Sequence, residues 1–183
     1  MSAGAWGVAR GGFLTLVSAL KNARYLNLMI RRSDIATLAC RSNMTNSLGS
    51  GMIQTNPAGL YKAPSYYVMK LYADHAKQVY VPIEGAPDSL DIVATASEDG
   101  KSLCVFAASM GAEPVELTLD LSAYPGMQCV GGETVQDTLD RRQAEVVNGW
   151  ARPDRMRAVE LKPTSAGVTV PAFSASAIEI NKR

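Results

Sequence analysis

Tyr61-Lys-Ala-Pro-Ser-Tyr-Tyr-Val-Met-Lys-Leu-Tyr-Ala-Asp-His75 is the stretch at which the pattern of the chain changes. Pro64 fits the first turn of a helix, where its missing N–H costs nothing. Four apolar residues then recur at the spacing of one helical face, namely Tyr67, Val68, Leu71 and Tyr72. The sequence before this predicted helix is typical of helix and loop, whereas the sequence after it is almost entirely typical of short strands. The segment therefore joins a helical part, residues 1–78, to a β part, residues 79–183.

The helical part begins with a long amphipathic pattern. Residues 13–32 place Phe13, Leu16 and Leu20 on one face, which predicts a helix of about five turns. The next apolar run, Ile35–Cys40, is too short for periodicity to decide between strand and helix. Residues 43–59 are rich in Asn, Ser, Thr and Gly, which predicts a long loop.

Beyond His75 the apolar residues alternate with a period of two. The Asp99-Gly100 pair between two apolar runs predicts a hairpin. The predicted strands are Val79–Ile83, Leu90–Ala96, Leu103–Ala108, Val115–Leu121, Met127–Val130, Met156–Leu161, and two more around Val168–Val170 and Ile178–Ile180. This pattern predicts a mainly β fold, an antiparallel jelly-roll-like sandwich preceded by the helical segment.

The charges are unevenly distributed although the formal net charge of the 183 residues is only +1. Residues 1–73 hold eight basic residues and one acid, whereas residues 74–183 hold ten basic residues and sixteen acids. A basic arm for nucleic acid is one interpretation. The other is that the two halves face each other, or that the first half faces acids elsewhere. The basic residues are scattered, so we favour the second interpretation and expect neither nucleic acid nor membrane as a partner.

The three cysteines, Cys40, Cys104 and Cys129, lie far apart in apolar runs, which predicts buried free thiols and a reducing compartment. The apolar run 13–20 is too short to span a bilayer and is not followed by a clear signal-peptide cleavage site, so a cytoplasmic location is favoured. One histidine and no C-x-x-C pair give no zinc site of the usual composition. We therefore expect no metal and no cofactor.

Several motifs in order resemble one enzyme family. They are residues 19–34, Ala39-Cys40, Asn46 and Pro64–Tyr72, followed by the predicted hairpin, Val115–Leu121, Asn148 and Val170–Ile180. Together they resemble the closing region of the α-L-arabinofuranosidases of glycoside hydrolase family 51. The sequence departs from the family pattern at Ala108-Ser109, usually Asn-Arg, and at Ala172, usually a second proline.

The resemblance implies a place in a larger enzyme. In that family a (β/α)₈ barrel carries a retaining mechanism and a jelly-roll sandwich packs beside it. Residues 13–32 would match the seventh barrel helix, residues 35–42 the eighth strand, and Pro64–Asp74 the eighth helix. Both catalytic glutamates would lie upstream, so we expect no catalytic residue here. Asn43 would stand near the sugar where the family usually has glutamine; the alternative is a loop asparagine that binds its own backbone.

The residues themselves also indicate that the catalytic pair is missing. Retaining glycoside hydrolysis needs two carboxyl groups about 5–5.5 Å apart. In the first 73 residues only Asp34 is acidic, and we expect it to cap a helix or pair with Arg31 or Arg32. His75 is the sole candidate for a Ser-His-Asp arrangement. The acids Glu133, Asp137 and Asp140 suit a solvated surface, and the aromatic residues Trp150 and Tyr124 could stack on sugars but more often pack at sandwich edges.

Three hypotheses follow. The chain is the C-terminal region of an α-L-arabinofuranosidase acting on arabinose-containing polysaccharides, inactive alone and completed by another polypeptide. Alternatively, it is a non-catalytic carbohydrate-binding module. The third hypothesis is a hydrolase that uses Asp34 or His75.

Two surfaces should need a partner if barrel neighbours are missing. Unpaired backbone groups in a strand at Ile35–Cys40 would cost about 1–3 kcal/mol each when buried. We therefore expect this segment to become helical, join the sandwich or pair with another chain. The face bearing Phe13, Leu16 and Leu20 should dock on the sandwich, or form an interface with an oligomer partner or a barrel.

Overall fold

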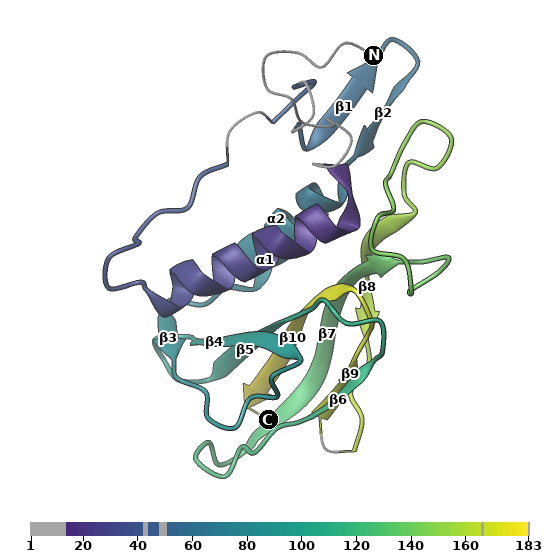
Figure 1. Cartoon of the computed structure of the whole chain (residues 1–183). Coiled ribbons are helices and arrows are strands. Elements are labelled where there is room, and N and C mark those ends of the chain that lie inside the picture. The colour runs from purple at the N-terminus through teal and green to yellow at the C-terminus, as the bar shows by residue number, and fades with distance from the viewer. Residues whose placement is uncertain (1–13, 42–43, 48–50, 166, 183) are drawn as a thin grey trace.

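The computed structural model describes residues 14–41, 44–47, 51–165 and 167–182 (Figure 1). Two helices, α1 (Leu16–Arg31) and α2 (Pro64–His75), lie across a sheet of the β part. The strands are β1 (Ile53–Asn56), β2 (Gly59–Lys62), β3 (Val79–Val81), β4 (Leu90–Ala96), β5 (Ser102–Ser109), β6 (Val115–Thr118), β7 (Met127–Asp137), β8 (Met156–Leu161), β9 (Gly167–Val170) and β10 (Ser174–Lys182). The predicted mainly β sandwich preceded by helices is confirmed.

Helix α2 begins at the predicted Pro64, whereas α1 begins at Leu16 and not at the predicted residue 13. Thr15 is the N-cap of α1, and its hydroxyl accepts a hydrogen bond from Ser18 N at 3.3 Å. Pro64 occupies the first turn of α2. Neither helix in the described part of the chain combines the length and apolarity needed to cross a bilayer.

The strands form an antiparallel sandwich. The six-stranded sheet has the order β3-β4-β5-β10-β7-β8, and the two-stranded sheet β6-β9 faces it. The Asp99-Gly100 turn joins β4 to β5, with Leu90 opposite Ser109 and Ala96 opposite Leu103. A separate hairpin, β1-β2, lies beyond the start of α2 (Figure 1).

The central strands of the large sheet are buried on both faces. On β5, Cys104, Phe106 and Ala108 face the helices, whereas Leu103, Val105 and Ala107 face the β6-β9 sheet. Strand β10 is divided in the same way. This double burial explains why Leu103–Ala108 reads as a continuous apolar run instead of an alternating one.

Strand β7 is longer than predicted because it contains a bulge. The register with β10 shifts between Glu179, which pairs with Gly131, and Ile180, which pairs with Cys129, so Val130 is the extra residue. Gly131 and Gly132, which follow it directly, have φ of 98° and 151°. A Cβ at Gly132 would lie 1.9 Å from the Ala177 carbonyl oxygen, so only glycine fits there. The strand therefore continues through the glycine pair to Asp137.

Two expectations for the helical part need correction. The predicted loop 43–59 is wrong at Ile53–Asn56, which forms β1 and pairs with β2. Segment Ile35–Cys40 is neither helix nor strand, and it does not join the sandwich. Ile35 and Leu38 in it are 71% and 78% exposed, so its backbone stays accessible to water or to another chain.

The face of α1 that bears Leu16 and Leu20 is buried inside this chain. Leu16 and Leu20 are 0% exposed and pack in the core between the helices and the sheet. The expectation that this face docks on the sandwich is confirmed for both residues. Leu16 and Leu20 are therefore not available to an oligomer or barrel partner, which corrects the alternative of an interface through these residues. Phe13 lies outside the described residues.

Replacing Phe106 with alanine should test this core. The ring is fully buried and stacks on Tyr72, with centroids 4.1 Å apart. Phe106→Ala should lower the free energy of unfolding by about 3–5 kcal/mol in urea titrations, because it removes a large, fully buried side chain and leaves a cavity between β5 and the helices. Val130→Ala, at a side chain 52% exposed, is the control and should change it little. Equal effects of the two substitutions would contradict this packing.

Candidate functional site

The sequence candidates for catalysis do not form an acid/base pair. Asn43, the implied sugar contact, lies outside the described residues. Asp34 accepts hydrogen bonds from Arg32 Nε at 3.1 Å and Arg32 Nη2 at 3.3 Å. This is the salt bridge that the sequence predicts, and it holds the pKa of Asp34 below its usual value. An exposed, ionised aspartate bound to an arginine is a poor general acid at neutral pH.

His75 is enclosed by carboxylates at the end of α2. Its Nδ1 lies 2.7 Å from Glu179 Oε1, and its Nε2 lies 3.4 Å from Glu133 Oε2. A histidine of a Ser-His-Asp arrangement keeps one ring nitrogen for the nucleophile's hydroxyl. Both nitrogens of His75 face carboxylates instead. The cluster therefore ties α2 to β7 and β10 and does not activate a nucleophile.

The acids of the β part also serve structural contacts. Asp137 is fully buried and receives two hydrogen bonds from Arg155, at 3.0 Å from Nε and 2.6 Å from Nη2. This paired, buried aspartate corrects the expectation of a solvated surface for Asp137. Burial raises the pKa of this carboxyl, but the bonds from Arg155 and the backbone outweigh burial and leave the pKa below its usual value. Burial also raises the pKa of Glu179, but the contacts with His75 and Lys77 outweigh burial and leave this pKa below its usual value.

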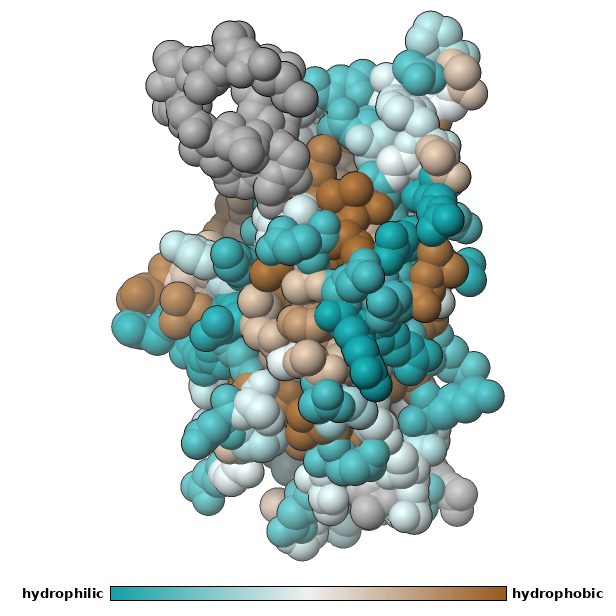
Figure 2. Space-filling model, turned by 45° about the vertical axis from the view of Figure 1, so that its right-hand side comes forward, coloured by the Kyte–Doolittle hydropathy of each residue, from teal (hydrophilic) through white to brown (hydrophobic). Residues whose placement is uncertain are grey.

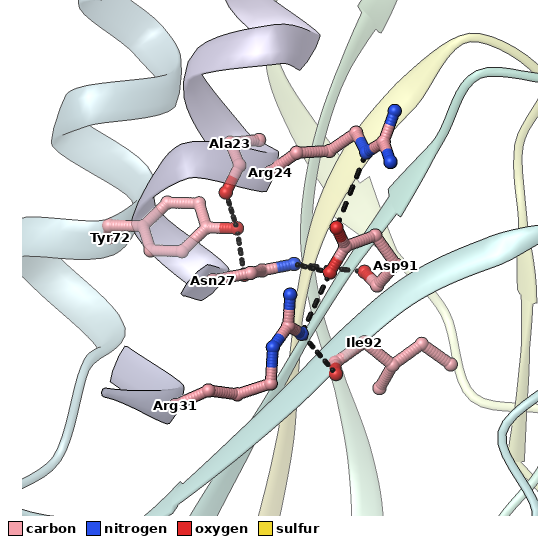
Figure 3. A network of polar contacts seen from close by, with 7 residues as sticks. All are labelled: Ala23, Arg24, Asn27, Arg31, Tyr72, Asp91 and Ile92. Carbon is pink, nitrogen blue, oxygen red and sulfur yellow. Dashed lines mark hydrogen bonds and ion pairs between the residues drawn. The ribbon is translucent and has the colours of Figure 1, made fainter. Parts of the chain in front are cut away.

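The position of α1 on the sheet depends on one carboxylate of β4, Asp91 (Figure 3). Arg31 Nη1 donates to Asp91 Oδ1 at 2.9 Å, and Arg24 Nε donates to Oδ2 at 3.3 Å. Burial raises the pKa of Asp91, but hydrogen bonds from Arg31, Asn27 and Arg24 leave it below the usual value. These pairs join a basic residue of the first half to an acid of the second, as the charge distribution suggests.

Asn27 connects the same carboxylate to α2 (Figure 3). Its amide nitrogen donates to the backbone oxygen of Asp91 at 2.9 Å and to Asp91 Oδ1 at 3.1 Å. Its amide oxygen accepts from the hydroxyl of Tyr72 at 2.5 Å. Every polar atom of this fully buried side chain has a partner, as a buried amide requires. The network fixes α1, α2 and β4 in one arrangement.

The faces of α1 and α2 that point away from the sandwich are only partly covered by the described residues. Asn22, Tyr25 and Met29 of α1, Met69 of α2, and residues 39–41 line a shallow groove of about 210 Å³. Asn22 Nδ2 is buried there without an acceptor among the described residues, and Tyr25 is 67% exposed. In Figure 2 the segment that projects beside the helices also carries hydrophobic surface. This groove, which we call the outer helix groove, has the composition of a docking surface.

A second surface lies at the end of the molecule where α2 begins. Tyr61 of β2 and Trp150 of the loop between β7 and β8 meet edge to face, with ring centroids 4.9 Å apart and planes at 87°. Trp150 is 53% exposed. The sequence indicates Trp150 as a candidate for sugar stacking. It does not indicate the contact with Tyr61, because 88 residues lie between the two in the chain. Tyr124, the other candidate, is half-buried against the sandwich core.

The described residues hold no group of three or more histidine, cysteine, aspartate or glutamate side chains arranged to bind a metal ion. Of the described cysteines, Cys104 is buried, and burial raises the pKa of its thiol to about 12, so it stays protonated. Cys40 is exposed, which corrects the expectation of a buried thiol there.

Taken together, these observations define a β-sandwich domain with two helices packed on one sheet and no catalytic constellation among the described residues. A model of the α-L-arabinofuranosidase C-terminal domain matches residues 9–174. The chain therefore belongs to that family, which confirms the resemblance drawn from its motifs. No curated protein sequence matches it significantly.

Solved structures share the fold. An α-L-arabinofuranosidase from Thermotoga maritima in complex with arabinose superposes with a TM-score of 0.73 at 23% identity, covering 91% of this chain and 38% of that one. A family 51 enzyme from Bifidobacterium longum gives 0.72 at 18% identity, covering 91% and 34%. The enzyme from Thermotoga petrophila gives 0.67 at 24%, covering 87% and 38%. The present chain thus spans less than two fifths of each of these proteins.

Substituting Asp91 should show how strongly its network holds the helices. Because the folded pKa is below the unfolded value of about 3.9, ionised Asp91 stabilises the folded state above that pH, and its contribution is lost as the pH falls through the folded pKa. Asp91→Asn should lower the unfolding free energy at pH 7 by about 1–3 kcal/mol. It should also flatten the loss of stability below about pH 5.

The exposed neighbour Asp88 gives a matched control for this measurement. Asp88→Asn should leave both the stability at pH 7 and its acid dependence close to those of the unsubstituted chain. An Asp91→Asn variant with the same acid profile as the Asp88→Asn variant would contradict the role of the network.

Proposed function

We propose that this chain is the C-terminal region of an α-L-arabinofuranosidase, an enzyme that removes terminal α-L-arabinofuranosyl residues from arabinose-containing polysaccharides. In this proposal residues 1–78 complete the end of a barrel and residues 79–183 form its companion sandwich. The two catalytic carboxylates come from sequence outside the 183 residues. The proposal rests on family membership and on the solved structures, two of which are α-L-arabinofuranosidases with folds like this one over the shared region.

The observation that carries the proposal is the outer helix groove. In a barrel of alternating strands and helices, each helix buries one face on the strands. Here the inner faces of α1 and α2 are buried on the sandwich, and the opposite faces are open. Segment Ile35–Cys40 runs on this open side with an accessible backbone, where a barrel strand would find its neighbours. The buried, unpaired amide nitrogen of Asn22 is a further group that a docked barrel could satisfy.

The protonation of the described acids also supports a scaffold role. A general acid for glycoside hydrolysis needs a raised pKa so that it carries a proton at neutral pH. Every described carboxyl group with a resolved shift has a lowered pKa, namely Asp34, Asp91, Asp99, Asp120, Asp137 and Glu179. The proton donor in this proposal is therefore supplied by the missing part of the enzyme.

Assays with an aryl α-L-arabinofuranoside test the proposal. The purified chain should give no turnover, and co-expression with the polypeptide encoded immediately upstream should restore it. Met29→Asp, which places a charge in the outer helix groove, should greatly reduce the restored activity. Leu139→Asp is the control, because Leu139 is 62% exposed in a distant loop. Turnover by the chain alone that disappears when one of its own carboxylates is removed would contradict the proposal.

A further inference from the structure

The loop between β7 and β8 presents Trp150 at the tip of a tight turn. Gly149 N donates to Arg152 O at 3.2 Å, and Arg152 N donates to Gly149 O at 3.0 Å. These two bonds leave Trp150 and Ala151 as the two residues of the tip. A tip of this kind is usually occupied by glycine, asparagine or aspartate, because it faces water. A large aromatic side chain at this position, 53% exposed, has no packing requirement from the turn itself.

The turn is held firmly in place by the residue before it. Asn148 is 2% exposed, and its amide nitrogen donates to Lys62 O and to Met156 O, both at 2.8 Å. Its amide oxygen accepts from Met156 N at 2.7 Å. The side chain therefore ties the start of β8 to the end of β2, next to Tyr61. These hydrogen bonds hold the backbone beside both Trp150 and Tyr61, so the fold brings the two rings together.

The two rings leave aromatic surface free. In an edge-to-face pair, the edge of one ring covers one face of the other, so the remaining faces are not used by the pair. Polar residues follow both rings in the sequence: Lys62, whose Nζ lies 4.7 Å from the centre of the Tyr66 ring, comes after Tyr61, and the exposed Arg152 and Asp154 come after Trp150 on the same loop. A rigid aromatic surface beside hydrogen-bonding groups suits a sugar ring, which has an apolar C–H face and a rim of hydroxyl groups.

We propose that Trp150 and Tyr61 form a platform on which a sugar ring of an arabinose-containing polysaccharide stacks. The choice of polysaccharide rests on the proposed function. The location of the platform agrees with the proposed function, because the platform lies at the N-terminal end of α2 (Figure 1). In (β/α)₈ enzymes the helices begin on the side of the barrel that carries the active site. The platform would therefore hold a part of the polysaccharide chain away from the bond that is cleaved.

Affinity electrophoresis of the purified chain in gels containing soluble arabinan tests this site directly. The unsubstituted chain should be retarded, and Trp150→Ala should bind about two- to tenfold more weakly. Val79→Ala is the control, because it removes an apolar side chain that is 46% exposed on the edge strand β3, and its retardation should be unchanged. Tyr61→Ala should weaken binding in the same direction as Trp150→Ala.

Fluorescence gives a second readout that does not depend on migration. The chain has two tryptophans, so a Trp6→Phe variant reports Trp150 alone. Arabino-oligosaccharides should shift its emission to shorter wavelength as the ring is covered. Absence of retardation, or equal retardation of the Trp150→Ala and unsubstituted chains, would overturn the platform. Neither result would contradict the proposed function, because that function is tested by the restored hydrolysis. Conversely, if hydrolysis were not restored, retardation that depends on Trp150 would still support the platform.

Discussion

The structure depends on the packing of two helices on one face of a sheet that is already covered on its other face. Burial of polar groups between these layers is acceptable only if each finds a partner. Asn27 finds all of its partners at once, from the hydroxyl of Tyr72 on α2 to the carboxylate and backbone of Asp91 on β4. The stacked rings of Tyr72 and Phe106 surround this network with apolar contact. A shift of either helix would unpair a buried amide or hydroxyl, so the layers have one stable arrangement.

This arrangement decides which surfaces are left for function. The inner faces of α1 and α2 are used by the sandwich, and the outer helix groove remains for a partner. Described acids such as Asp91, Asp137 and Glu179 form ion pairs with arginine, histidine or lysine, and these contacts favour the ionised carboxylate. A domain built in this way can position neighbouring elements, and the proposed platform at Trp150 would add a contact to a polysaccharide. Proton donation to a glycosidic oxygen would require a carboxyl group with a raised pKa.

Much of this fold could be predicted from the sequence, and the failures have physical causes. The alternation of apolar residues predicted Leu90–Ala96 and Met156–Leu161 with the observed bounds. Strand β7 was cut short at Val130, because a glycine pair suggests a break where the chain forms a bulge. Hairpin β1-β2 was missed because four-residue strands with polar sequences give no periodic signal. The Asp91 network and the Tyr61–Trp150 contact join residues far apart in sequence, so residue spacing alone does not indicate them.

Hydrogen exchange of the isolated chain tests the central claim most directly. If the helices and the sandwich share one core, the amides of α1 between Leu20 and Asn27 should be protected to the same degree as those of β5 and β10. The amides of residues 37–40 should exchange rapidly, because this segment has no regular structure in the isolated chain. Protection of residues 37–40 in the isolated chain, or an α1 that exchanges far faster than β5, would contradict the account.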